Sequence, residues 1–131
     1  MKKQFHVVGA IIENEQKEIF CALRGPDMSL AGFWEFPGGK IETGETPEEA
    51  LVREIKEEFN CEIEVREKVE DTTYEYEDVM VRLETFKAKL IAREPIATEH
   101  AEVRWISRDE IRYLNFAPAD VPAVEKISKK Q

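Results

Sequence analysis

Residues 39–61 read GKIETGETPEEALVREIKEEFNC, and the clearest element in this stretch is a helix. Thr46 is a good N-cap residue, and the proline after it suits the first helical position. Glu49, three residues after Thr46, completes a capping box. The apolar positions continue to Phe59. We therefore predict a helix over 46–59.

The predicted helix has two different faces. Leu51, Ile55 and Phe59 recur every four residues, which predicts a buried stripe, with Val52 beside it. Three carboxylates share a second face because they are spaced three and four residues apart. They are Glu54, Glu57 and Glu58.

The carboxylate face is costly for a helix that only has to be stable. Each pair of like charges at these spacings costs ~0.2–0.5 kcal/mol. Clustered oxygen ligands suit a hard cation such as Mg²⁺ or Mn²⁺, and no cluster of His and Cys points to zinc. Since protein-bound Mg²⁺ often shares its ligands with substrate phosphates, the pattern indicates phosphate chemistry. A solvated surface helix remains the alternative on spacing alone.

Sequence on both sides of the helix predicts a mixture of strands, loops and further helices. Before it, 5–12 and 18–23 predict a hairpin, and 25–40, with four of the six glycines, predicts an irregular loop. After it, strands are predicted over 61–70, 79–92 and 102–107. A second capping box, Ser107 with Glu110, predicts a short helix to about Leu114, and 118–130 predicts a terminal helix with Val121, Val124 and Ile127 facing inward. This order predicts an α/β or α+β sandwich.

Composition limits the class of protein. The 131 residues are expected to form one domain, 1–131, with Cys21 and Cys61 as buried free thiols in the cytoplasm. A net charge of −9 argues against binding a nucleic-acid polymer or an anionic membrane surface. No apolar run is long enough to span a membrane, and no targeting segment is expected at the N-terminus.

The negative charge is concentrated in one part of the chain. Residues 42–78 hold 15 acidic and 4 basic residues, a net of −11. The global charge argument is therefore limited, because an acidic protein binds a very anionic ligand when metal ions lie between them.

The stretch from Gly39 to Cys61 resembles the Nudix box, G-x5-E-x7-R-E-U-x-E-E-x-G-U with U aliphatic, of the Nudix hydrolases. Two positions depart from the motif: Asn60 replaces a glycine and Cys61 an aliphatic residue. The segment FWEFPGGKIETGETPEEALVRE, the later EHAEVRW and the terminal APADVPAVEKI are similar to the MutT branch, which hydrolyses nucleoside triphosphates. The resemblance implies an α/β/α sandwich around a mixed sheet. The motif positions that match are Gly39, Glu45, Arg53, Glu54, Ile55, Glu57 and Glu58.

The resemblance also implies roles for individual residues. Mg²⁺, or Mn²⁺, would be held by the three helical glutamates, the carbonyl of Gly38 and Glu99, although Glu99 is otherwise an ordinary loop acid. Arg53 would orient Glu54, and Glu45 would be a carboxylate that supports the metal ligands without binding the metal itself. Lys40 and Arg24 would bind the substrate phosphates. The alternative for Arg24 is a plain surface arginine.

The expected reaction converts a nucleoside triphosphate and water into a nucleoside monophosphate and pyrophosphate. A carboxylate would take the proton of the attacking water. Glu54 is the first candidate for this base and Glu99 the second.

The terminal segment bears on which base is recognised. Asp120 stands where the founding MutT enzymes have an asparagine, and an ionised Asp accepts hydrogen bonds only, which suits the exocyclic amine of cytosine. The segment also resembles the CTP pyrophosphohydrolase subgroup. A protonated Asp120 would instead donate to an oxidised purine, which keeps 8-oxo-dGTP as an alternative, and a helix cap is a third interpretation. Aromatic side chains that would either stack on the base or belong to the core are Trp34, Phe36 and Phe116.

Other classes of function remain as alternatives. A non-catalytic Nudix module that binds a nucleotide would usually lack box carboxylates, and REIKEE is intact here. Hydrolysis of nucleotide sugars or dinucleoside polyphosphates is disfavoured because 62–94 lack the proline typical of ADP-ribose-cleaving relatives. His6 and His100 are expected to be structural. A monomer and a homodimer both fit the sequence.

Overall fold

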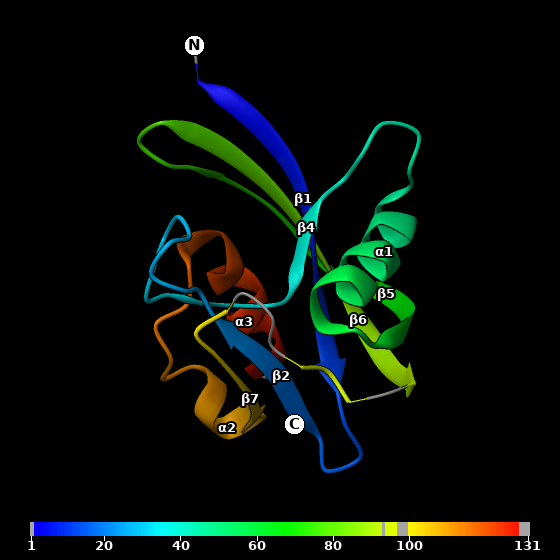
Figure 1. Ribbon diagram of the computed structural model, residues 1–131. Helices are drawn as coiled ribbons and strands as arrows, with labels where there is room; N and C mark the ends of the chain where they lie inside the picture. Colours follow the sequence, from blue (N-terminus) through cyan, green and yellow to red (C-terminus); the bar gives the residue numbers. More distant parts are fainter. Residues whose placement is uncertain (1, 93, 97–99, 129–131) are drawn as a thin grey trace.

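The computed structural model describes residues 2–92, 94–96 and 100–128. Its described strands form one mixed sheet in the order β3-β2-β1-β6-β5, with β4 added to β1 and β7 added to β2 (Figure 1). The strands are β1 (Lys3–Glu13), β2 (Glu18–Leu23), β3 (Trp34–Glu35), β4 (Gly38–Lys40), β5 (Glu62–Glu75), β6 (Val79–Ala92) and β7 (Glu102–Ser107). The helices are α1 (Pro47–Phe59), α2 (Arg108–Ile111), the 3₁₀ turn η1 (Pro118–Asp120) and α3 (Val121–Ser128).

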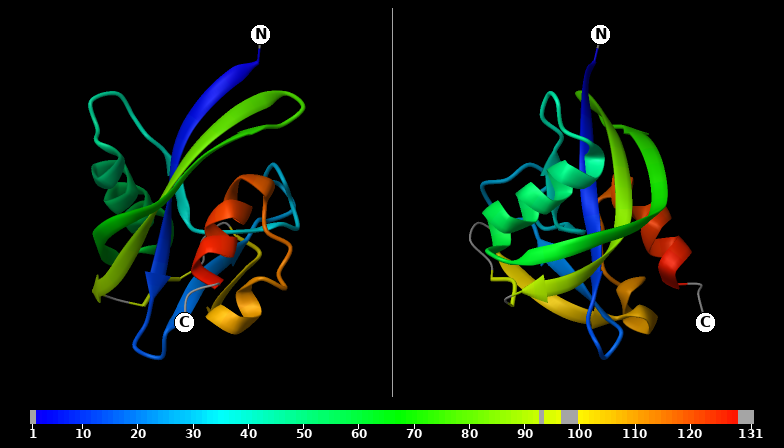
Figure 2. Two further views of the ribbon diagram at one scale, coloured as in Figure 1. Left: turned by 180° about the vertical axis from the view of Figure 1, so that it is seen from behind. Right: turned by 90° about the vertical axis from the view of Figure 1, so that its right-hand side faces the viewer.

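Helices cover both faces of the sheet. Viewed from the side, α1 lies on one face of β1 and β6, and α3 lies on the other (Figure 2). The predicted α/β/α sandwich with a mixed sheet is confirmed, since β1 and β6 are parallel and the other pairs are antiparallel. None of the described helices is long and apolar enough to cross a membrane.

β1 contributes to two hydrophobic cores because its side chains alternate between the faces of the sheet. Val8 and Ile12 point into the core under α1, together with Phe59, whereas Ile11 joins the core under α3 with Ile127. A strand covered on both faces reads as an unbroken apolar run, which explains the sequence of residues 8–12.

Helix α1 begins and ends as predicted. The side chain of Thr46 accepts a hydrogen bond from the backbone N–H of Glu49, and Glu49 returns one to Thr46. Asn60 adopts a left-handed conformation, with φ of 53°, and its N–H donates to the carbonyl of Lys56. Val52 differs from the prediction: it is 39% exposed because the sheet covers only the stripe formed by its neighbours.

The predicted hairpin is only partly correct. β1 and β2 pair at Glu13 and Ile19, but β1 runs parallel to β6 along its whole length and β2 pairs mainly with β7. Within the predicted irregular loop 25–40, two short strands form, because β3 pairs with β2 and β4 with β1. These pairings join distant segments, and local sequence does not encode them.

The elements after α1 also differ in detail. β5 is longer than predicted, because it pairs with β6 as far as Glu75. The predicted capping box of α2 is wrong: the Ser107 hydroxyl donates to the Glu110 carboxylate and accepts no hydrogen bond from a backbone N–H of the helix. In the terminal segment, η1 precedes α3, and Val121 is 36% exposed whereas Ala123 is buried with Val124 and Ile127.

Candidate active site

Arg53 lies between the carboxylates of α1 and the loop before the helix. Its Nε and Nη2 donate to the two oxygens of Glu45 at 2.6 and 3.0 Å. Its Nη1 donates to Glu54 at 3.1 Å and to Glu57 at 3.2 Å, and Nη2 also reaches the carbonyl of Lys40 at 3.0 Å. One guanidinium therefore holds three of the sequence-predicted acids in place, with the bidentate geometry that arginine favours.

These contacts change the proton affinities of both partners. The hydrogen bond from Arg53, together with one from the backbone N–H of Glu42, lowers the pKa of Glu45 below its ordinary value. The same hydrogen bond raises the pKa of Arg53, because it stabilises the charged guanidinium, and Arg53 is charged at any physiological pH. Arg53 and Glu45 thus form a fixed ion pair next to the carboxylates of Glu54 and Glu57.

Glu54 packs directly against the backbone of β4. A β-carbon added at Gly39 would lie 2.4 Å from the Glu54 carboxylate, so a side chain does not fit there. Gly38 is tighter still, because its added β-carbon would lie 1.8 Å from the carbonyl oxygen of Val8. The two glycines therefore let β4 lie close to both β1 and the carboxylate face of α1.

The other predicted metal ligands are less closely gathered. The Glu57 side chain is 61% exposed, and Glu58 is partly buried on the same helix. Glu99 lies outside the described residues. Among the residues that the structure describes, no three carboxylate, imidazole or thiol groups converge into a ready-made metal site.

The donors nevertheless fit a hard divalent cation. Glu54 and Glu57 both lie within hydrogen-bond distance of the same Arg53 nitrogen, so their oxygens already converge on one positive charge. All of these donors are carboxylate oxygens, the type that Mg²⁺ and Mn²⁺ prefer. The contact with Gly39 fixes Glu54 on the side of β4.

The two predicted phosphate-binding cations differ: Arg24 is hydrogen-bonded to other residues, whereas Lys40 is exposed. Arg24 donates from Nη1 to Glu35 at 2.6 Å, and from Nε and Nη2 to the carbonyl and hydroxyl of Ser29. Lys40 is exposed, and its Nζ lies 4.1 Å from the ring centroid of Phe5. Arg24 is therefore an ordered, partly buried residue and not a plain surface arginine, whereas Lys40 is free to reach a ligand.

The aromatic residues of the loop belong to the core. Phe36 is only 3% exposed, and its ring centroid lies 5.1 Å from that of Phe116. Trp34 is 8% exposed, and its backbone pairs with Phe116 as an isolated bridge. Of the two interpretations of Phe36, stacking on a base and packing in the core, the structure therefore shows the second.

Asp120 is buried beside the loop that contains Phe36. It is 6% exposed, and its Oδ1 accepts a hydrogen bond from the Phe36 N–H at 3.3 Å. Burial raises the pKa of Asp120 well above its ordinary value, and the charge of Glu35 adds to this effect. Burial therefore favours the neutral form of the side chain, which has a donor as well as an acceptor.

The sequence prediction missed two acids, Glu35, which is partly buried, and Glu84, which is buried. Glu35 bridges Arg24 and His100, whose Nε2 lies 2.7 Å from Glu35 Oε2. Glu84, 3% exposed, contacts His6 and Lys68; burial acts to raise its pKa, but the hydrogen bonds from Lys68 and His6 outweigh this effect and lower the pKa. The only sequence signal for Glu35 is its place within WEFPGG, and for Glu84 a charge inside an apolar strand.

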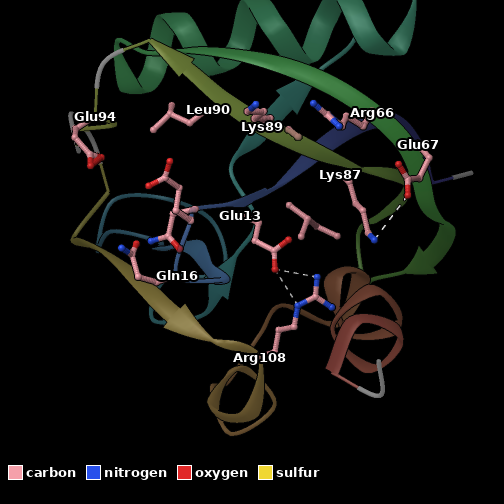
Figure 3. Close-up of a pocket in the computed structure, with 13 residues that line it drawn as sticks. Glu13, Gln16, Arg66, Glu67, Lys87, Lys89, Leu90, Glu94 and Arg108 are labelled. Carbon is pink, nitrogen blue, oxygen red and sulfur yellow. Dashed lines mark hydrogen bonds and ion pairs between the residues drawn. The ribbon is translucent and has the colours of Figure 1, made fainter. Parts of the chain in front are cut away.

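A cavity of about 710 Å³ lies away from these residues (Figure 3). It lies between the end of β6, the β1–β2 turn and α2, and none of the sequence-predicted site residues lines it. Its lining has four basic and four acidic side chains, and two pairs of them are in contact: Arg108 with Glu13 at 3.0 Å and Lys87 with Glu67 at 3.7 Å. A lining without excess positive charge is a poor site for a polyphosphate, which favours the carboxylate face of α1 as the candidate active site.

Known proteins resemble the chain over nearly its whole length. The NUDIX domain signature matches residues 7–126. The 8-oxo-dGTP diphosphatase of Escherichia coli K12 is 35% identical over 127 residues, covering 97% of this chain and 98% of the relative. The CTP pyrophosphohydrolase of the same organism is 37% identical over 123 residues, covering 94% and 90%.

A solved structure shows the same similarity in three dimensions. It is the solution NMR structure of the DNA mismatch repair protein MutT, family Nudix hydrolase, from methicillin-resistant Staphylococcus aureus 252. It is 49% identical, superimposes with a TM-score of 0.81 and covers 100% of both chains. The matching domain signature, the full-length relatives and the intact box on α1 agree. The chain therefore belongs to the Nudix family, as a MutT-like hydrolase that acts on nucleotide anhydrides.

Proposed function

We propose that this protein is a divalent-metal-dependent pyrophosphohydrolase that converts cytidine or modified nucleoside triphosphates into monophosphates and pyrophosphate. One observation carries the proposal: Arg53 holds Glu45, Glu54 and Glu57 together on an intact Nudix box. Such an enzyme removes unwanted nucleotides from the pool. The family as a whole is typically dependent on divalent metal ions.

Each residue of the site has a separate task in this proposal. Glu54, Glu57 and Glu58, with the carbonyl of Gly38, would hold the cation, and Glu99 is a further candidate ligand. The bound cation would neutralise phosphate charge and lower the pKa of a bound water. Lys40 and Arg24 would meet the phosphates.

Proton transfer is assigned to a carboxylate of the same face. Glu54 would take the proton of the attacking water, because its contact with Gly39 and its hydrogen bond from Arg53 fix its position. A positioned base of this kind accelerates proton transfer by about 10²–10⁴-fold. Glu99 remains the second candidate for the base.

Asp120 would select the base of the nucleotide. In its neutral form, which burial favours, the carboxyl group would suit the pairing edge of cytosine, because it would donate to the ring nitrogen N3 and accept from the exocyclic amine. The same raised pKa favours 8-oxo-dGTP as a second candidate substrate, since the carboxyl proton also pairs with a purine carbonyl. The relatives named for CTP and for 8-oxo-dGTP have nearly equal identity to the chain.

A panel of substrates tests the proposal. Pyrophosphate release is measured with Mg²⁺ for CTP, dCTP, 5-methyl-dCTP, 8-oxo-dGTP and ADP-ribose. The proposal expects the highest kcat/KM for a cytidine nucleotide. Preference for 8-oxo-dGTP with cytidine nucleotides ignored overturns the assignment of the base, and absence of pyrophosphate release from every nucleoside triphosphate overturns the activity.

The proposal also includes a setting for the protein. Its substrates are free nucleotides, and neither a nucleic-acid polymer nor a membrane is a partner. We place it in the cytoplasm as a single domain of residues 1–131, acting as a monomer or homodimer.

A further inference from the structure

Both carboxylate oxygens of Glu35 are engaged, and each has a different partner. Oε1 accepts a hydrogen bond from Arg24 Nη1 at 2.6 Å, and Oε2 lies 2.7 Å from His100 Nε2. Because a carboxylate only accepts hydrogen bonds, the imidazole donates from Nε2. The Glu35 side chain is 16% exposed and that of His100 is 3% exposed, so water competes weakly for these contacts. Glu35 thus connects the segment before β7 to the start of the β2–β3 loop.

Besides its contact with Glu35, His100 is held by its ring and by the backbone of the next residue. Its ring is stacked on Phe59, the last residue of α1, with centroids 5.3 Å apart and an angle of 28° between the planes. The next residue, Ala101, donates its backbone N–H to the carbonyl of Leu23 at 2.9 Å. The imidazole is therefore a rigid support, anchored to α1 and to the end of β2.

Of the three side chains, Arg24 is the one that would contact a ligand. Its Nε and Nη2 hold Ser29, and its backbone N–H donates to Phe33, which closes the loop around it. A guanidinium has five N–H donors, and three of those of Arg24 have partners among the described residues. The remaining donors are on the two terminal nitrogens, so the contact of Nη1 with Glu35, together with those to Ser29, decides where they point.

We propose that His100 is a positioning residue that fixes the guanidinium of Arg24 through Glu35. Without the imidazole donor, the Glu35 carboxylate rotates and Arg24 loses one of the three hydrogen bonds that fix its plane, leaving only the two to Ser29. A planar cation that is oriented in advance binds phosphate better than a rotating one, because less side-chain entropy is lost on binding. The inference rests on the proposed function, which assigns Arg24 to the substrate phosphates.

A measurement without substrate tests the positioning directly. His100→Phe keeps an aromatic ring against Phe59 but removes the donor, whereas His100→Gln places an amide N–H near the position of Nε2. We expect ¹⁵N relaxation of the Arg24 Nε–H to show a rigid side chain in the wild type and in His100→Gln, and a mobile one in His100→Phe. An equally rigid Arg24 in folded His100→Phe overturns the proposal, whatever the protein hydrolyses.

Kinetics separate positioning from a general structural role. With CTP, His100→Phe is expected to raise KM about tenfold with a smaller change in kcat, as for a lost hydrogen bond to a charged group. In an Arg24→Ala background the same substitution should have no further effect. An equal loss in both backgrounds, accompanied by a lower unfolding temperature, means that His100 only supports the fold. If Arg24→Ala alone leaves KM unchanged, the phosphate role of Arg24 in the proposed function is wrong, and the relaxation experiment still decides the positioning.

Discussion

Asp120 shows how burial changes the chemistry of a single carboxyl group. A sequence shows that the residue is acidic, and an ionised side chain is the ordinary expectation. Burial and the nearby charge of Glu35 instead raise its pKa, although the Phe36 N–H and Arg24 act in the opposite direction. Burial thus favours a form that donates as well as accepts hydrogen bonds, which would alter the set of bases that the residue recognises.

The raised pKa of Asp120 predicts how stability depends on pH. Above the ordinary value of 3.8, the unfolded chain releases this proton while the folded protein keeps it. The free energy of unfolding therefore falls as pH rises, by about 1.4 kcal/mol per pH unit, until the raised pKa is reached. Asp120→Asn keeps an oxygen for the Phe36 N–H but has no proton to release.

Urea denaturation measures this difference. As the pH rises above 3.8, the wild type is expected to lose stability relative to Asp120→Asn. Parallel pH profiles for the two proteins would show that Asp120 is ionised in the folded state.

Helix α1 shows how much an element can be predicted from local sequence. Its N-cap and its buried stripe follow from neighbouring residues, and the structure confirms them. The shared face of Glu54 and Glu57 was predictable for the same reason, and so was the proximity of Arg53. What local sequence did not reveal was β3, β4 and the parallel pairing of β1 with β6, because these form between distant segments.

Site residues follow the same division. Glu35 and His100 are 65 positions apart in sequence, and their contact exists only because β3 and the segment before β7 flank β2. The burial of Phe36 and Asp120 likewise depends on packing between loop and terminal segment. The carboxylates on one helix were therefore predictable, whereas the residues that surround them from other elements were not.

The end of α1 carries a prediction about backbone conformation. Asn60 has a φ of 53°, in the left-handed region that favours glycine and tolerates asparagine. We expect Asn60→Ala to lower the free energy of unfolding by about 1 kcal/mol, since the β-carbon of an L-alanine is strained in the left-handed region. Asn60→Gly, the residue of the family motif, should change it by only a few tenths of a kcal/mol, roughly. Equal losses in both variants, measured by urea denaturation, would place the importance of Asn60 in its side chain instead.

The charge of the whole molecule is consistent with a cation at the active site. The net charge of −9 comes from residues 42–78, which carry −11, and seven of the acidic residues lie within the Nudix box. Arg53 balances part of this charge in the structure. The remaining repulsion between carboxylates would be relieved by a bound divalent ion.

Metal binding should therefore stabilise the folded protein. A ligand that binds only the folded state adds about 2.7 kcal/mol at a concentration one hundred times its Kd. We expect Mg²⁺ to raise the unfolding temperature of the wild type and EDTA to reverse the effect. The rise should be smaller in Glu57→Gln; the same rise in both proteins would locate the bound ion elsewhere.

The most direct test of the central claim compares two glutamates on the same helix. Glu57→Gln changes a carboxylate of the proposed metal site, and Glu48→Gln removes an equal charge from the exposed first turn of α1. Mg²⁺-dependent pyrophosphate release from CTP is measured for both variants and the wild type, after circular dichroism has shown that each is folded. We predict that Glu57→Gln loses activity by about a hundredfold or more, as when a group that stabilises transition-state charge is removed, while Glu48→Gln stays close to wild type. A folded Glu57→Gln that is as active as the wild type would contradict the assignment of the active site to this face.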